Sequence, residues 1–106
     1  MPPDLATLTR ELDRLAASAH TPDDGLANAR AIVKAIGDAR LYLNLPKFEI
    51  EMLESHGYHD DAKAWWKKVK RLEEDIRADL LRLATCVDEL RRERFRIYWA
   101  VVKVQR

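Results

Sequence analysis

The clearest pattern in the chain is a heptad repeat of apolar residues over its last 45 positions. Every seventh residue of one register is apolar: Ala62, Val69, Ile76, Leu83, Leu90, Ile97 and Val104. The companion apolar position begins at Trp65 and Leu72, fails at Asp79 and resumes one residue later at Leu80. A straight α-helix drifts in this way against a strict seven-residue repeat. Because neither glycine nor proline occurs after Gly57, we predict one helix over about residues 60–105, with a broad coiled-coil-like seam and a length of roughly 69 Å.

Shorter helical patterns precede this segment. A first helix, about residues 4–19, is indicated by leucines that recur at spacings of three and four: Leu5, Leu8, Leu12 and Leu15. A second helix, about residues 22–44, is indicated by an apolar stripe and by a start signal. Thr21 is its candidate N-cap, Pro22 takes the first helical position, and two aspartates follow where the helix dipole favours negative charge.

Pro46 marks the predicted boundary of the second helix. The proline ring disfavours helical angles at Leu45, so we expect the chain to break or kink there. A short third helix, about residues 46–56, follows, and Gly57 suits its C-terminal end because glycine adopts left-handed backbone angles readily.

These lengths predict an all-α fold, a lopsided antiparallel bundle of three to four helices that forms a single domain over residues 1–106. Helices joined by short loops pack as antiparallel neighbours. A first helix of about 24 Å can then cover only the C-terminal half of the long helix. We therefore expect that half, with Ile97, Tyr98 and Val101, to be buried by two neighbours, and the other half to be covered by the third helix alone.

The less covered half of the long helix carries two adjacent tryptophans. Trp65 and Trp66 point about 100° apart on a helix, so one short helix does not bury both. An uncovered aromatic patch on a protein usually marks an interaction surface. The predicted interface consists of residues from the third and the long helix: Trp65, Trp66, Val69, Leu72, Phe48 and Met52.

The charge distribution leaves an alternative open. Residues 1–61 carry 6 basic and 11 acidic groups (−5), whereas residues 62–106 carry 13 basic and 7 acidic groups (+6). Lysines and an arginine surround the tryptophans in a pattern that can neutralise phosphates and stack on bases: Lys63, Lys67, Lys70 and Arg71. The competing interpretation is that carboxylates of the third helix and its turn neutralise them: Glu49, Glu51, Glu54, Asp60 and Asp61.

The other candidate functional residues do not alter these predictions. The arginines Arg91, Arg92, Arg94 and Arg96 alternate with carboxylates and are interpreted as a solvated helix face. His56 and His59 beside two aspartates are interpreted as polar turn residues, and Cys86 as a small buried residue. We predict no catalytic residues, no metal, no cofactor and no small-molecule substrate. The apolar run 97–102 is far below the roughly 20 residues of a membrane span, and no signal peptide is visible, so we expect no membrane association and a cytoplasmic location.

The sequence therefore favours a non-enzymatic helical protein–protein interaction module, such as a small adaptor, regulator or inhibitor. We expect it to bind a protein partner or to self-associate as a homodimer or larger homo-oligomer. The alternative is a nucleic-acid-associated protein that uses the basic and aromatic stretch 63–71.

Overall fold

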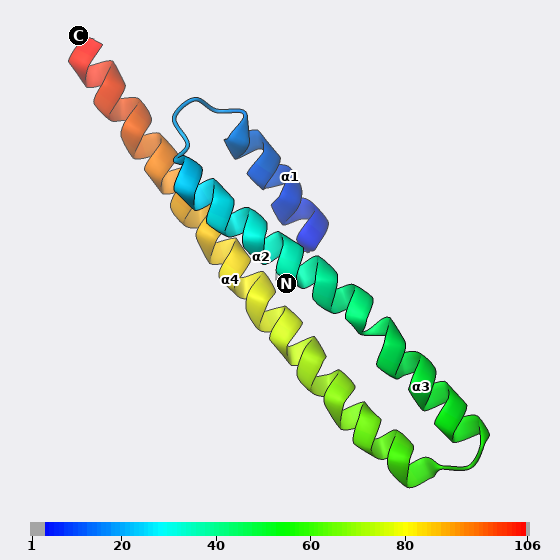
Figure 1. The fold of residues 1–106 in the computed structure, drawn as a ribbon. Helices are drawn as coiled ribbons and strands as arrows, with labels where there is room; N and C mark the ends of the chain where they lie inside the picture. The colour runs from blue at the N-terminus through cyan, green and yellow to red at the C-terminus, as the bar shows by residue number, and fades with distance from the viewer. Residues whose placement is uncertain (1–3, 106) are drawn as a thin grey trace. The chain divides into compact units, whose positions relative to one another are not determined.

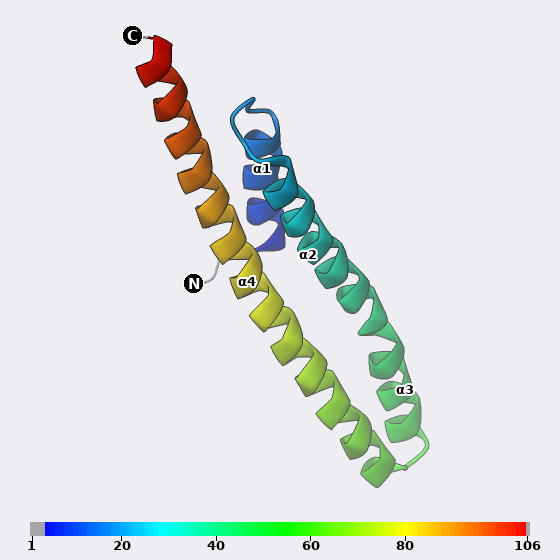
Figure 2. The ribbon, with the colours of Figure 1, turned by 60° about the vertical axis from the view of Figure 1, so that its left-hand side comes forward.

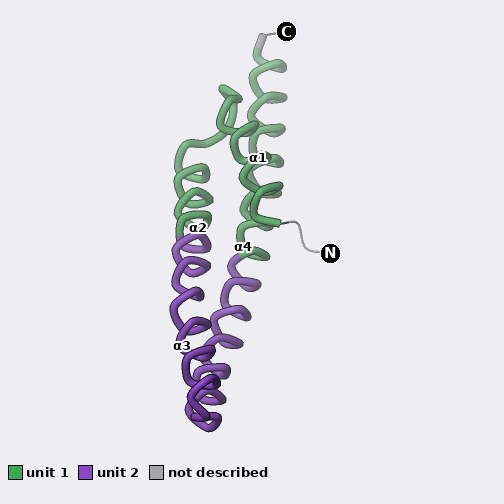
Figure 3. Tube along the Cα trace, turned by 90° about the vertical axis from the view of Figure 1, so that its right-hand side faces the viewer, with its two compact units in different colours: residues 1–34, 80–106 green, residues 35–79 purple. Residues whose placement is uncertain are grey.

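The fold is all-α over residues 4–105, which a computed structural model describes. The four helices are α1 (Leu5–Ala16), α2 (Asp23–Tyr42), α3 (Asn44–Ser55) and α4 (His59–Gln105) (Figure 1). The predicted all-α class and the very long C-terminal helix are both confirmed. The described chain forms two compact units, one built from the residues up to 34 and from 80 onward, the other from residues 35–79 (Figure 3).

The first unit contains α1, the beginning of α2 and the second half of α4. Helix α1 begins where the Asp4 carboxylate accepts a hydrogen bond of 2.7 Å from the backbone N–H of Thr7. Thr21, the predicted N-cap of α2, makes no such bond. It is buried, and its hydroxyl has no hydrogen-bond partner among the described residues. Three leucines of α1 pack with apolar residues of α2 and α4 in one core: Leu8, Leu12, Leu15, Ala29, Ile32, Leu83, Val87 and Leu90.

The second unit contains the end of α2, all of α3 and the first part of α4. The boundary between α2 and α3 lies at Leu43, so the predicted break at Pro46 was wrong in position. Pro46 lies in the first turn of α3, and Leu45 is helical. Proline has no N–H for the carbonyl four residues earlier, that of Tyr42, and its ring crowds that carbonyl. The interruption therefore falls at the residue after Tyr42, where α2 ends.

The core of the second unit lies between α3 and α4. It consists of residues from the end of α2, from one face of α3 and from the heptad seam of α4: Ile36, Leu43, Pro46, Ile50, Ala62, Val69 and Ile76. Gly57 ends the turn that joins the two helices and has a φ of 82°, which is the left-handed region. The N–H of Tyr58 then reaches the carbonyl of Leu53 at 2.9 Å, as at a glycine-terminated helix end.

Candidate interaction surfaces

The C-terminal part of α4 is exposed, contrary to the predicted burial by two neighbours. Every residue from 91 to 101 is exposed, including Ile97, Tyr98 and Val101. The reason is the register of α2, whose first turn lies beside Leu90: a Cβ built on Gly25 would come within 2.5 Å of Cδ2 of that leucine. Helix α4 continues for residues 91–105 beyond this level, past the connection between α1 and α2 (Figures 1 and 2).

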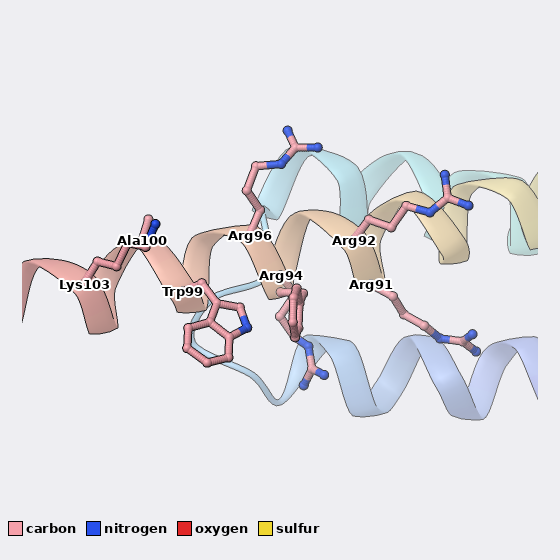
Figure 4. A pocket seen from close by; sticks show the side chains of 8 residues that line it. Arg91, Arg92, Arg94, Arg96, Trp99, Ala100 and Lys103 are labelled. Carbon is pink, nitrogen blue, oxygen red and sulfur yellow. The ribbon is translucent and has the colours of Figure 1, made fainter.

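This exposed segment carries basic residues around two aromatic rings, which we call the arginine–aromatic surface. Its members are Arg92, Arg94, Phe95, Arg96, Trp99 and Lys103 (Figure 4). The rings of Phe95 and Trp99 lie edge to face with centroids 5.8 Å apart. Tyr98 extends this group, since its ring centroid lies 5.9 Å from that of Trp99.

Two of the arginines on α4 have carboxylate partners within the first unit. Arg91 bonds to Glu11 of α1 with an Nη2–Oε2 distance of 2.8 Å, and Figure 4 shows its side chain directed to that helix. Arg96 lies 4.0 Å from Glu93 on its own helix. No ion pair joins Arg92 or Arg94 to any of residues 4–105. Arg92 and Arg94 of the arginine–aromatic surface therefore carry charge that no ion pair of the described residues uses.

The second unit carries a second apolar surface, on the face of the α3–α4 hairpin that points away from α4. We call it the outer row: Leu41, Leu45, Phe48 and Met52. Their exposed fractions are 70%, 67%, 61% and 45%. The spacings of three and four place Leu45, Phe48 and Met52 on one face of α3, and Leu41 lies four residues earlier, at the end of α2. The buried residues Leu43, Pro46 and Ile50 form a row of the same spacing, displaced by two positions and hence by roughly 200° around the axis. Helix α3 is thus apolar on two opposite faces, and one of them faces solvent.

The predicted interface residues divide between surface and core. Phe48 and Met52 belong to the outer row, whereas Val69 is completely buried in the seam of the hairpin. The two tryptophans flank that seam on opposite sides. Trp66 is 42% exposed and donates from Nε1 to Oε1 of Glu54 at 3.4 Å.

Trp65, on the other side of the seam, is half-buried, as is Leu72. The ammonium of Lys68 lies 4.5 Å from the centroid of the Trp65 ring. This contact is a cation–π interaction that covers part of the ring. The two tryptophans therefore do not form a single patch.

The predicted basic stretch is exposed and is not neutralised by α3. Lys63, Lys67, Lys70 and Arg71 all face solvent. Within residues 4–105 none of them forms an ion pair with a carboxylate of α3, so the competing interpretation has no direct ion pair in its support. The ion pair that does join the two helices is Lys47 to Glu73, with an Nζ–Oε1 distance of 3.9 Å.

Two further candidate groups from the sequence are His56 and Cys86. The Nδ1–H of His56 donates a hydrogen bond of 2.8 Å to the Met52 carbonyl, at the end of α3. Cys86 is half-buried in the first unit. The described residues contain no group of three or more histidines, cysteines or carboxylates placed to hold a metal ion. None of the helices between residues 4 and 105 has the length and apolar character needed to cross a membrane.

Comparison of the chain with protein-family models, with curated proteins and with solved structures finds no match.

Proposed function

We propose that this chain is a non-enzymatic helical protein-interaction module that self-associates, and that the outer row is its contact surface. The observation that carries the proposal is the two-sided apolar character of α3. One apolar face is enough for a helix packed on a single neighbour. A second exposed apolar face is typical of a surface that is covered in an assembly. Such a module acts by occupying a surface, as a small adaptor, regulator or inhibitor does.

The energetic gain from covering the outer row is large for a chain of this size. An aromatic side chain buries about 150–250 Å² in all, so the exposed part of Phe48 offers roughly 100 Å². At about 25 cal/mol per Å², its burial contributes roughly 2–3 kcal/mol. Leu41, Leu45 and Met52 add comparable apolar area, since they are 45–70% exposed. This gain is absent when the chain is alone, so association is favoured.

The test is the mass of the protein in solution, measured by size-exclusion chromatography with light scattering. We expect the wild type to have a mass of at least twice the 12.3 kDa of one chain. Leu45→Glu places a charge in the outer row and should return the mass to that of one chain, with helical circular dichroism retained. Leu81→Glu is the matched control, because Leu81 is a leucine of α4 with 58% exposure outside the outer row.

A wild type that remains monomeric at high concentration would overturn the proposal. Loss of association in Leu81→Glu as well as in Leu45→Glu would show that any added charge is sufficient, and it would remove the outer row from the argument.

A second candidate function is nucleic-acid association through the basic stretch of α4. The observation that favours it is the exposure of Lys63, Lys67, Lys70 and Arg71 without carboxylate partners from α3. Phosphate contacts by such side chains give salt-dependent binding of low sequence preference. Trp66 lies on the same helix and is partly exposed, so it could add stacking on a base.

A further inference from the structure

We infer that the outer row of one chain is covered by the arginine–aromatic surface of a second copy of the same chain. This inference rests on the proposed function, because it names the partner of the surface proposed there. Three observations support it: the charges that border the two surfaces, the arrangement of the apolar side chains on each, and the apolar area that the two surfaces expose.

The outer row is bordered by carboxylates. Glu49 lies four residues after Leu45 and three before Met52, which makes it their neighbour on the helix surface. Glu51 lies three residues after Phe48, and both glutamates are exposed. Lys47, the basic residue nearest to them on α3, is directed to Glu73 of α4. The border of the outer row is therefore acidic.

The aromatic rings at the end of α4 are bordered by bases at the same helical spacings. Arg92 lies three residues before Phe95, and Arg96 lies three residues before Trp99. Lys103 lies four residues after Trp99 and is also exposed. The border of these rings is therefore mainly basic, with Glu93 beside Arg96, whereas the border of the outer row is acidic. Complementary borders of this kind steer association and fix the register of a contact.

The apolar parts of the two surfaces also match in form. Phe95 and Trp99 form a ridge of residues four apart, with ring centroids 5.8 Å from each other. In the outer row, Leu41 with Leu45 and Phe48 with Met52 are pairs of the same spacing. Ridges of residues four apart pack into the grooves between such pairs in the commonest class of helix–helix contact.

The area favours an arrangement in which each chain uses both surfaces. The six apolar side chains of one contact offer on the order of 500 Å² of exposed area, when each contributes somewhat less than 100 Å². A specific interface needs roughly 1,000 Å² in total. Each chain carries both surfaces, so a second copy can bring a second contact of the same kind. Two such contacts together reach the area of a specific interface.

The decisive experiment reverses the charge of each surface in a separate protein. The first variant carries Arg92→Glu, Arg94→Glu and Arg96→Glu, so its α4 end and its outer row both have acidic borders. The second carries Glu49→Arg and Glu51→Arg, so both of its borders are basic. We expect each variant alone to be monomeric by light scattering, because like charges oppose each other in both contacts.

Mixing the two variants should restore a pair with a mass of about twice 12.3 kDa. In the mixture, the reversed α4 end meets the reversed outer row, and the two unchanged surfaces also meet. A chain that carries both reversals should associate with itself again. Variants that associate alone like the wild type, or a mixture that remains monomeric, would overturn the inference. An anionic membrane or a nucleic acid as the natural ligand of the arginines would give this second outcome.

A matched control separates the contact from a general effect of charge. The variant Lys63→Glu, Lys67→Glu, Lys70→Glu changes the net charge by the same amount as the first variant, but it lies outside both surfaces. It should associate like the wild type. Because three new glutamates could weaken the α4 helix, a second variant carries Arg92→Gln, Arg94→Gln and Arg96→Gln. For this variant we expect a dissociation constant at least about tenfold larger than that of the wild type.

The two proposals fail in different ways. A monomeric wild type removes self-association, and the proposed function with it. A wild type that associates and is dissociated by Leu45→Glu, but is unaffected by the charge reversals, removes only the assignment of the second surface.

Discussion

Gly25 of α2 lies directly against Leu90 of α4 in the first unit. A Cβ on the glycine would come within 2.5 Å of Cδ2 of the leucine and within 3.5 Å of its Cγ. Leu90 is only 4% exposed, so neighbouring side chains limit its movement. The absence of a side chain on Gly25 allows the two helices to approach at this level.

We expect Gly25→Ala to lower the free energy of unfolding by about 1 kcal/mol, because overpacking of a filled core costs about 1–3 kcal/mol and the gain in helix propensity offsets part of it. Gly37→Ala is the control, since a Cβ there would meet nothing within 4 Å. It should raise the free energy of unfolding by about 0.5–1 kcal/mol through helix propensity. Thermal unfolding followed by circular dichroism measures both. A stabilised Gly25→Ala would show that Leu90 can move aside.

The ion pair between Glu11 and Arg91 should contribute little to stability and should depend on salt. Glu11 and Arg91 are both partly solvated, and pairs of this kind contribute about 0.2–1 kcal/mol. We expect a double-mutant cycle with Glu11→Gln and Arg91→Gln to give a coupling energy in that range at low ionic strength. The coupling should fall at about 1 M salt, where the Debye length is about 3 Å. A coupling that salt leaves unchanged would contradict this account.

The tryptophans of α4 should respond differently to truncation. Trp65 is half-buried beneath Lys68, so Trp65→Ala should lower the free energy of unfolding by about 2–3 kcal/mol, somewhat less than for a fully buried ring. Trp66 is more exposed and lies outside both contact surfaces, so we expect Trp66→Ala to remain helical by circular dichroism and to associate like the wild type. If both variants unfold, both rings belong to the hairpin core. If both remain folded and associate normally, the rings are incidental to assembly.

The basic stretch of α4 should not bind nucleic acid specifically. We expect the wild type to bind DNA or RNA weakly, with an affinity that falls steeply between 50 and 200 mM salt. Lys63→Glu, Lys67→Glu, Lys70→Glu should abolish this binding and leave the mass in solution unchanged. Tight binding with a sequence preference, measured by fluorescence anisotropy and lost in this variant, would favour the second candidate function over the first.

The sequence predicted the helices well because their signals are local. The apolar heptad position and the absence of glycine and proline placed α4 at residues 60–105, within one residue of its observed start. Gly57 marked the end of the hairpin turn for the same reason, since its left-handed backbone requires a residue without Cβ. Pro46 was also recognised, but its effect falls on the carbonyl of Tyr42, four residues earlier.

The sequence did not predict which surfaces are exposed, because this depends on the register between helices. Helix lengths do not fix that register. Aligning the helices by their ends predicts burial for Ile97 and Val101, which are exposed. Gly25 was the available signal, as a glycine in the first turn of a helix marks a close approach. The outer row is also visible as a spacing in the sequence, but the two apolar faces of α3 are equivalent until the position of α4 is known.

The division of the chain into units has a consequence for the order in which the protein acquires structure during synthesis. Residues 35–79 form an uninterrupted stretch, so the hairpin is complete once residue 79 has left the ribosome. Its contacts are close in sequence, and such contacts form fast. The unit that contains α1 lacks Leu83, Val87 and Leu90 at that moment. The leucines of α1 therefore remain without their partners on α4 until these residues have also left the ribosome, and during that interval they expose apolar surface.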